Sequence, residues 1–201
     1  MPAPVNALAE TSRGVRPSSR DIDLAILEAA AEIFARHGWA GTSVQQIADA
    51  VGYSKAGLLR RFPSKQNLYD KTLTATRELV ENLLGQVPPL GEPDRRDVLL
   101  RALITTSSAH LGKVKLIIAA MEKPAELPAS QPIAELGLAV IKQLSSETAD
   151  QVGRVRAVLA TQLVINAIFL SSDPGLPVEL QLPTHQYHDL AYQIAKGVLG
   201  D

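Results

Sequence analysis

The sequence predicts an all-α protein with an N-terminal three-helix domain and a larger C-terminal helical domain. Apolar residues recur at helical spacing along most of the 201 residues, and no alternating runs or Asn-Gly hairpin signals interrupt them. Prolines cluster between these periodic segments, where they end helices. Residues 43–62 read as two short helices that are joined by a three-residue turn, which is the pattern of a helix-turn-helix.

The composition bounds the class of protein. The chain has no cysteine, which excludes disulfides and thiolate chemistry, and its net charge is −1, so nucleic-acid binding would depend on local charge. The N-terminus lacks the pattern of a secretory signal, and the most apolar stretches, LIIAAM and LVINAIFL, are too short to span a bilayer. We therefore expect a soluble, cytoplasmic protein with no membrane partner.

The first helix follows a proline-containing arm. Residues 1–19 contain three prolines and no apolar period, and are predicted to be a disordered arm. Its Arg13 and Arg16 would either contact DNA phosphates or the minor groove, or be exposed to solvent without a binding role. A helix is expected from Ser19 or Asp21 to His37, and Gly38 ends it. Its apolar stripe consists of Ile22, Ile26, Ala29, Ala30 and Ile33.

The helix-turn-helix at 43–62 carries a basic outer face. Apolar residues with the spacing of one buried helix face precede Gly52, which suits a C′ position: Val44, Ile47, Ala48 and Val51. Ser54 can cap the second short helix, in which Leu58 and Phe62 are predicted to point inward. Lys55, Leu59 and Arg60 would then face outward. Such a unit has the shape and charge that reading a DNA major groove requires.

The remaining helices are long. Ser64 is expected to cap a helix at 64–87, which precedes an acidic and basic linker, GEPDRRD. Further helices are predicted near 94–110, 113–123, 131–149, 151–171 and 184–199.

Residues 21 to about 81 resemble the DNA-binding domain of the TetR family of bacterial transcriptional regulators. The resemblance is carried by AAAEIFARHGWAGTSVQQIADAVGYSKAGLLRRFPSKQNLY, which is far more specific than a generic helix-turn-helix. It implies a DNA-binding domain at 20–81 and an effector-binding and dimerisation domain at 82–201. It also implies that regulation runs through the helix at 64–87 and that helices 151–171 and 184–199 form a homodimer interface.

Geometry and the resemblance together predict the DNA contacts. Leu59 departs from the family, which mostly has tyrosine there, and Gly57 replaces a common threonine. Arg61 stands where many relatives have a histidine that is directed at phosphate. The predicted DNA-binding residues are Thr42, Ser43, Gln45, Tyr53, Ser54, Lys55, Gly57, Leu59, Arg60, Arg61 and Lys65.

The second domain is predicted to hold a small, largely apolar effector. The helix at 151–171 is apolar on nearly every face, which predicts a helix that is buried all round and contains two amides. Buried polar groups need partners, and these would be either a ligand or other groups of the protein. The candidate ligand-binding residues are Leu103, Thr106, Ser107, His110, Met121, Gln162, Asn166 and Phe169.

The favoured function is a dimeric repressor that binds a pseudo-palindromic operator and that the effector releases. An activator on the same fold and a helical adaptor that has lost DNA binding remain alternatives. His185, His188 and Asp189 have metal-like spacing, but without a closed ligand set a polar helix face explains them better. We expect no catalytic residues, no metal and no cofactor.

Overall fold

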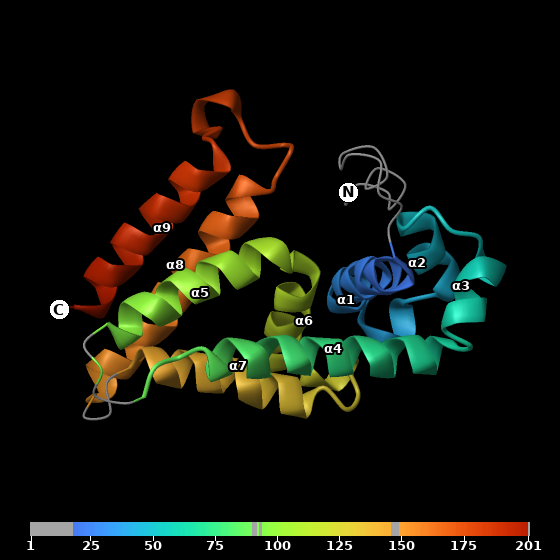
Figure 1. Ribbon diagram of the computed structural model, residues 1–201, viewed down its shortest axis with the longest axis horizontal. Helices are drawn as coiled ribbons and strands as arrows, with labels where there is room; N and C mark the ends of the chain where they lie inside the picture. The colour runs from blue at the N-terminus through green and yellow to red at the C-terminus, as the bar shows by residue number, and fades with distance from the viewer. Residues whose placement is uncertain (1–17, 90–91, 93, 146–148, 201) are drawn as a thin grey trace. The chain divides into compact units, whose positions relative to one another are not determined.

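The computed structural model describes residues 18–89, 92, 94–145 and 149–200. Most of the predicted arm, with Arg13 and Arg16, lies outside this part of the chain. The described residues form helices without strands, so the all-α prediction is confirmed (Figure 1). The helices are α1 (Ser19–Gly41), α2 (Val44–Ala50), α3 (Lys55–Arg61), α4 (Lys65–Gly85), α5 (Arg95–Ala109), α6 (Leu111–Glu122), α7 (Gln131–Leu144), α8 (Gln151–Ser171) and α9 (Thr184–Leu199), with 3-10 turns η2 (Pro124–Glu126) and η3 (Val178–Leu180).

The ends of several helices differ from the prediction. Ser18, expected in the arm, is the N-cap of α1, where its hydroxyl accepts a hydrogen bond from the Asp21 amide. Helix α5 agrees with the helix predicted near 94–110 to within one residue at each end, so Arg95 and Arg96 of the GEPDRRD segment belong to α5. Helix α7 ends at Leu144 rather than at residue 149. The bounds of α8 and α9 are those predicted from the apolar period and the flanking prolines.

The chain divides into two compact units, and the division differs from the expected one. The first unit contains the chain up to Leu79 together with Leu111–Glu135, and the second contains Val80–His110 and the chain from Leu136 onward. The first boundary lies close to the expected residue 81, but α6 returns to the N-terminal unit. The reason is apolar packing, because Leu116 and Ala120 of α6 are fully buried in the same core cluster as Phe34 of α1.

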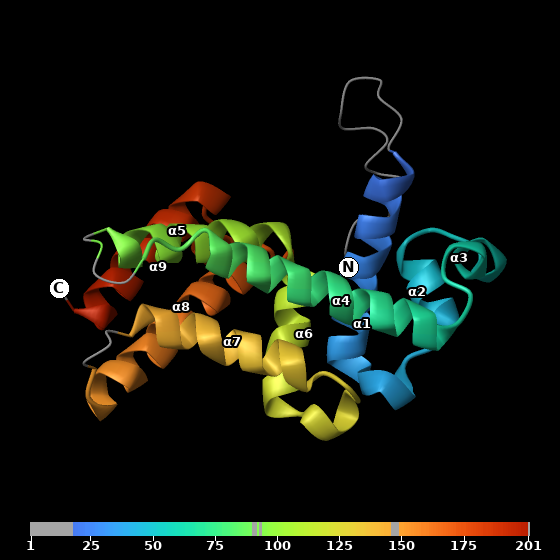
Figure 2. The same cartoon turned by 60° about the horizontal axis from the view of Figure 1, so that its bottom comes forward.

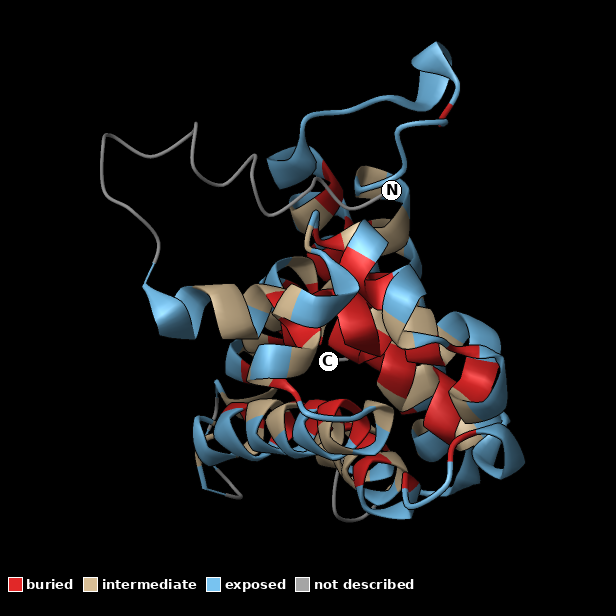
Figure 3. Cartoon of the chain, turned by 90° about the vertical axis from the view of Figure 1, so that its right-hand side faces the viewer, coloured by how far each residue is buried: buried red, intermediate tan, exposed pale blue. Residues whose placement is uncertain are grey.

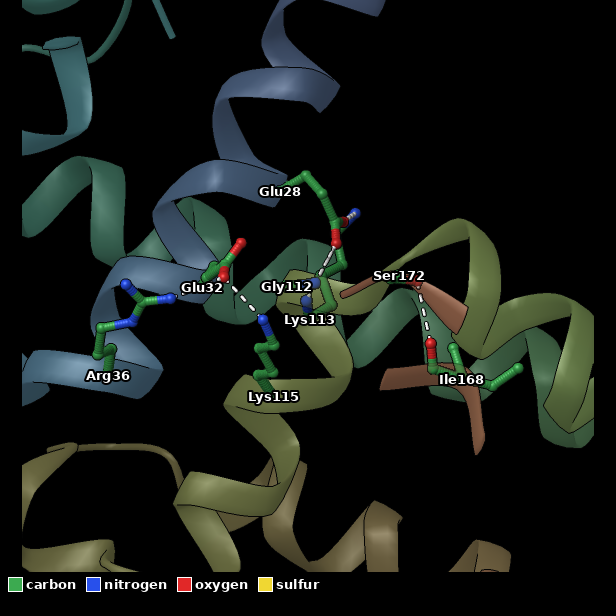
Figure 4. A network of polar contacts seen from close by, with 8 residues as sticks. All are labelled: Glu28, Glu32, Arg36, Gly112, Lys113, Lys115, Ile168 and Ser172. Atoms are coloured by element: carbon green, nitrogen blue, oxygen red, sulfur yellow. Dashed lines mark hydrogen bonds and ion pairs between the residues drawn. The ribbon is translucent and has the colours of Figure 1, made fainter. Parts of the chain in front are cut away.

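Polar contacts reinforce the packing of α6 on α1 (Figure 4). The Glu28 carboxylate accepts hydrogen bonds from the backbone amides of Gly112 and Lys113 at the start of α6, and its second oxygen pairs with the Lys113 ammonium at 2.9 Å. The Lys113 side chain is only 4% exposed. A second pair, Glu32–Lys115, joins the same two helices at 2.7 Å. This α1–α6 junction thus contains a buried cation that is paired with a carboxylate.

An aromatic cluster lies in the core of the first unit. The rings of Phe34 and Tyr69 meet edge to face with centroids 4.7 Å apart, and Trp39 lies 5.0 Å from Tyr69. The Tyr69 hydroxyl donates a hydrogen bond to the Pro128 carbonyl at 2.9 Å. Burial, with a smaller contribution from the charge of Asp70, raises the pKa of Tyr69 to about 12.

This raised pKa makes the stability of the protein depend on pH in the alkaline range. Because the pKa of Tyr69 is higher in the folded than in the unfolded chain, its contribution is complete below about pH 10 and is lost as the pH rises towards 12. We expect the free energy of unfolding to fall by about 2 kcal/mol across that interval from this group. Urea unfolding at several pH values measures the change, and Tyr69→Phe should flatten it. An equally steep fall in that variant would contradict the assignment.

The second unit is built on α5, α8 and α9, and α8 packs along α9 (Figures 1 and 2). The prediction that α8 is buried all round is wrong. One face is buried through Ala157, Ala160, Thr161, Val164 and Ile168, whereas Val155 and Leu159 on the opposite side are 51% and 55% exposed. Figure 3 shows that buried, intermediate and exposed residues alternate along the helices of the chain. Periodicity alone could not separate a face that meets its own chain from one that the single chain leaves uncovered.

Candidate nucleic-acid interface

Helix α2 packs against both α1 and α3. Its predicted stripe is confirmed, since Ile47 and Ala48 are fully buried and Val51 is 1% exposed. Ser43 is the N-cap, and a capping box forms in which the Ser43 hydroxyl accepts from the Gln46 amide while the Gln46 side chain accepts from the Ser43 amide at 2.7 Å. A serine hydroxyl that accepts such a bond keeps its hydrogen for donation, so the cap and a phosphate contact are compatible.

Thr42 does not fit the predicted DNA-binding set. Its side chain is 3% exposed, and its hydroxyl donates to the Gly38 carbonyl at 2.8 Å. Gly38 has φ of +67°, which turns the backbone between the main part of α1 and its last residues and brings this carbonyl towards Thr42. The Thr42 hydroxyl therefore stabilises the end of α1. Of the two hydroxyls at the start of α2, only that of Ser43 is exposed to a ligand.

The turn between α2 and α3 follows the expected geometry. Gly52 has φ of +71°, a conformation that L side chains rarely adopt, and the Tyr53 amide donates back to the Ala48 carbonyl at 2.9 Å. Tyr53 is partly buried. The turn is therefore fixed by backbone geometry, which sets the angle at which α3 leaves α2.

Helix α3 presents cations on its outer face. Ser54 caps it by accepting from the Gly57 amide at 3.0 Å. Leu58 is fully buried and Phe62 is 6% exposed, as predicted. Lys55 and Arg60 are exposed, and Leu59 is partly exposed. The helix thus combines an anchored apolar side with a basic outer side.

Arg61 occupies a different position from the one expected. Its guanidinium forms an ion pair with Asp23 of α1 and also donates to the backbone carbonyl and the hydroxyl of Ser19, at 3.3 and 3.1 Å. A carboxylate that already satisfies this cation competes with a DNA phosphate. Asp23 and Ser19 were missed because they lie far from Arg61 in the sequence, where no local pattern connects them. Arg61 therefore ties α3 to the start of α1.

Lys65 and Gln45 are also engaged within the unit. The Lys65 ammonium lies 4.4 Å from the centre of the Trp39 ring, within cation–π range. The Gln45 side-chain amide donates to the Asp49 carboxylate at 2.6 Å, one turn along α2. Both contacts are on accessible side chains, so they orient these groups at the edge of the basic surface and leave them within reach of a ligand.

The predicted effector-binding residues are only partly brought together. Leu103 and Ser107 are buried on α5, and Thr106 and His110 are partly buried in the same unit, as is Phe169 of α8. The buried-amide interpretation is wrong for Gln162 and Asn166, which are exposed on the uncovered side of α8. Met121 belongs to the first compact unit, on α6. The error for Gln162 and Asn166 comes from the assumption that α8 is covered on all sides, whereas Met121 lies apart because α6 packs in the first unit.

Two polar features of the second unit were not predicted as pairs. The Ser108 hydroxyl and His188 Nε2 are 2.6 Å apart and join α5 to α9. The Lys196 ammonium pairs with Asp97 at 3.0 Å, and hydrogen bonds from Lys196 and then Tyr192 hold the pKa of the Asp97 carboxyl below its usual value. Within the part of the chain that the structure describes, no group of three His, Cys, Asp or Glu side chains could hold a metal ion.

The comparisons with known proteins match the N-terminal unit. Residues 26–72 match the family described as bacterial regulatory proteins, tetR family. The transcriptional regulator RutR of Escherichia coli K12 is 42% identical over 65 residues, which are 32% of this chain and 29% of RutR. The transcriptional repressor AcnR of Corynebacterium diphtheriae is 34% identical over 91 residues, 40% of this chain and 46% of AcnR. Both are named as regulators of transcription, not as enzymes.

The fold is also similar to solved structures over most of the chain. The crystal structure of AibR in complex with isovaleryl coenzyme A and operator DNA has a TM-score of 0.53 and 22% identity, and covers 86% of this chain and 97% of AibR. At this identity the likeness concerns the fold. The sequence matches to RutR and AcnR span less than half the length of either relative.

Proposed function

The chain belongs to the tetR family of bacterial regulatory proteins, and on that premise we propose that it is a ligand-responsive, DNA-binding regulator of transcription. In this proposal it is a repressor that binds a pseudo-palindromic operator as a homodimer and is released by a small, largely apolar effector. The observation that carries the proposal is the exposure of Lys55 and Arg60 on a recognition helix whose opposite side is anchored by Leu58. Because its proposed partner is operator DNA, the protein would act in the cytoplasm.

Alanine variants of two basic residues test DNA binding. Arg60→Ala and Lys65→Ala should each weaken binding to an operator fragment by about tenfold, because each removes a contact to phosphate or to a base edge. Gel shifts of genomic fragments identify the operator, and Lys142→Ala on α7 serves as the control because it removes one exposed positive charge from the other compact unit. A helical adaptor without DNA binding would give no specific shift with any of these proteins.

The exposed faces of α8 and α9 support the homodimer. Val155 and Leu159 of α8 and Leu190 and Ile194 of α9 are 44–55% exposed in the single chain, although α8 and α9 pack against each other. By length and composition α8 could also cross a membrane. We favour a second copy of the chain as the cover, because the exposed side of α8 also carries Gln162 and Asn166, which suit a protein interface better than lipid.

A charge placed on this face tests the dimer. Leu159→Arg should convert the protein to a monomer and lower operator affinity by at least tenfold, because each subunit then has to bind its half-site without a linked partner. Sedimentation equilibrium gives the oligomeric state. Val178→Arg is the matched control, since Val178 is 77% exposed but lies in η3 outside both helices. A wild-type protein that sediments as a monomer would contradict this part of the proposal.

An effector site in the second unit completes the proposal. Leu103, Thr106 and Ser107 lie on α5, His110 is its C-cap, and Phe169 of α8 is partly buried in the same unit. AibR, with a similar fold, is named in complex with both an acyl coenzyme A and operator DNA, which supports a small molecule as the signal. Helix α4 contributes residues to both compact units, so a ligand that favours one position of α4 would alter DNA binding.

A further inference from the structure

We propose that α3 reads each operator half-site mainly through the C5 methyl groups of thymines, which Ala56 and Leu59 contact, flanked by guanines that Lys55 and Arg60 recognise. The inference rests on the proposed function and adds to it the chemical identity of the bases. It follows from which side chains of α3 remain available and from which chemistry they carry.

The structure leaves four side chains of α3 for the groove. Leu58 and Phe62 are buried in the core of the first unit. Gly57 has no side chain, and Arg61 is held by Asp23 and Ser19 of α1. The remaining residues lie at i, i+1, i+4 and i+5, which is a single helix face, and three of them are exposed while Leu59 is partly exposed. The reading face is thus Lys55, Ala56, Leu59 and Arg60.

The chemistry of this face excludes direct contacts to two of the four bases. Adenine is read by the amides of Asn or Gln, and cytosine by an acceptor such as a carboxylate, and α3 has neither group. In the preceding helix each glutamine already uses one end of its side-chain amide within the chain, since the Gln46 oxygen accepts from the Ser43 amide and the Gln45 nitrogen donates to Asp49. Neither amide is therefore available for the two-bond contact that reads adenine. Lysine and arginine suit the O6 and N7 acceptors of guanine, and alanine and leucine suit the methyl of thymine. Only guanine and thymine are thus matched by this face.

The methyl contacts should have a measurable effect. Removing one buried methyl group corresponds to about a fourfold loss of affinity. Leu59, as the largest apolar group on the reading face, should account for most of that loss at one position of each half-site. The electrostatic contacts of Lys55 and Arg60 stay the same when only a base methyl is removed.

Deoxyuridine substitution tests the inference directly. The full-length protein first selects its preferred duplex from a random-sequence pool at low salt, and each thymine of that duplex is then replaced by deoxyuridine. We expect one or two thymines in each half-site at which the dissociation constant rises about fourfold, and little change at the others. The same series with Leu59→Ala should lose the effect at the position that Leu59 contacts. Leu138→Ala, an exposed leucine of the second unit, should retain it.

The outcomes separate the inference from the proposed function. Specific binding in which no thymine responds to loss of its methyl overturns the inference and leaves the DNA-binding function intact. Full methyl sensitivity in Leu59→Ala also overturns it, because the effect would then come from the stiffness of the DNA. Failure to select any preferred duplex overturns the proposed function and the inference with it.

Discussion

Replacing Glu28 by alanine is expected to lower the free energy of unfolding by about 3 kcal/mol, because the change leaves the buried Lys113 ammonium without its counter-ion. The Lys113 side chain is 4% exposed, and Glu28 is its ion-pair partner at 2.9 Å. The same substitution removes the acceptor for the first backbone amides of α6, which have no partner inside their own helix. Chemical denaturation with urea measures the loss.

Two further variants make this prediction specific. The double variant Glu28→Ala/Lys113→Met should recover part of the loss, because an apolar side chain of similar length replaces the unpaired charge. Glu32→Ala is the matched control, since Glu32–Lys115 joins the same helices but its lysine is 34% exposed, and it should cost about 1 kcal/mol or less. Equal losses in Glu28→Ala and Glu32→Ala would show that burial of Lys113 has no energetic weight.

Replacing Gly112 by alanine should be similarly destabilising, by about 2–3 kcal/mol. A Cβ at this position would lie 2.2 Å from the Glu28 backbone carbonyl oxygen, so α6 would have to move away from α1 and the Glu28 cap would be disrupted. Gly197→Ala in α9 is the control, because nothing lies within 4 Å of its Cβ position, and it should stabilise the protein by about 0.5–1 kcal/mol. A neutral Gly112→Ala would contradict the close approach of the two helices.

The helix-turn-helix could be predicted from sequence because its determinants are local. The stripe Val44–Val51, the positive φ of Gly52 and the cap residues Ser43 and Ser54 are each separated by a few positions, and the structure contains all of them. Leu58 and Phe62 are buried for the same reason. Short-range spacing therefore fixed both the fold of this unit and the outward direction of Lys55 and Arg60.

Long-range contacts account for what the sequence did not reveal. Arg61 and Asp23 are separated by 38 positions, and no pattern links them. The return of α6 to the first unit depends on the close fit of Gly112 against Glu28, which only the folded chain displays. The apolar character of α8 was identified, but the exposure of one of its faces was not, because a sequence period does not tell whether the same chain or a second copy covers a face.

The salt dependence of operator binding tests the central claim most directly. If Lys55, Arg60 and Lys65 of two subunits displace condensed counter-ions from the duplex, at base edges or at phosphates, the logarithm of the association constant should fall with the logarithm of salt concentration with a slope of about −5. Arg60→Ala should reduce the steepness by about 2, since each dimer loses two cations. A slope near zero, or an unchanged slope in Arg60→Ala, would contradict a basic recognition helix seated on duplex DNA.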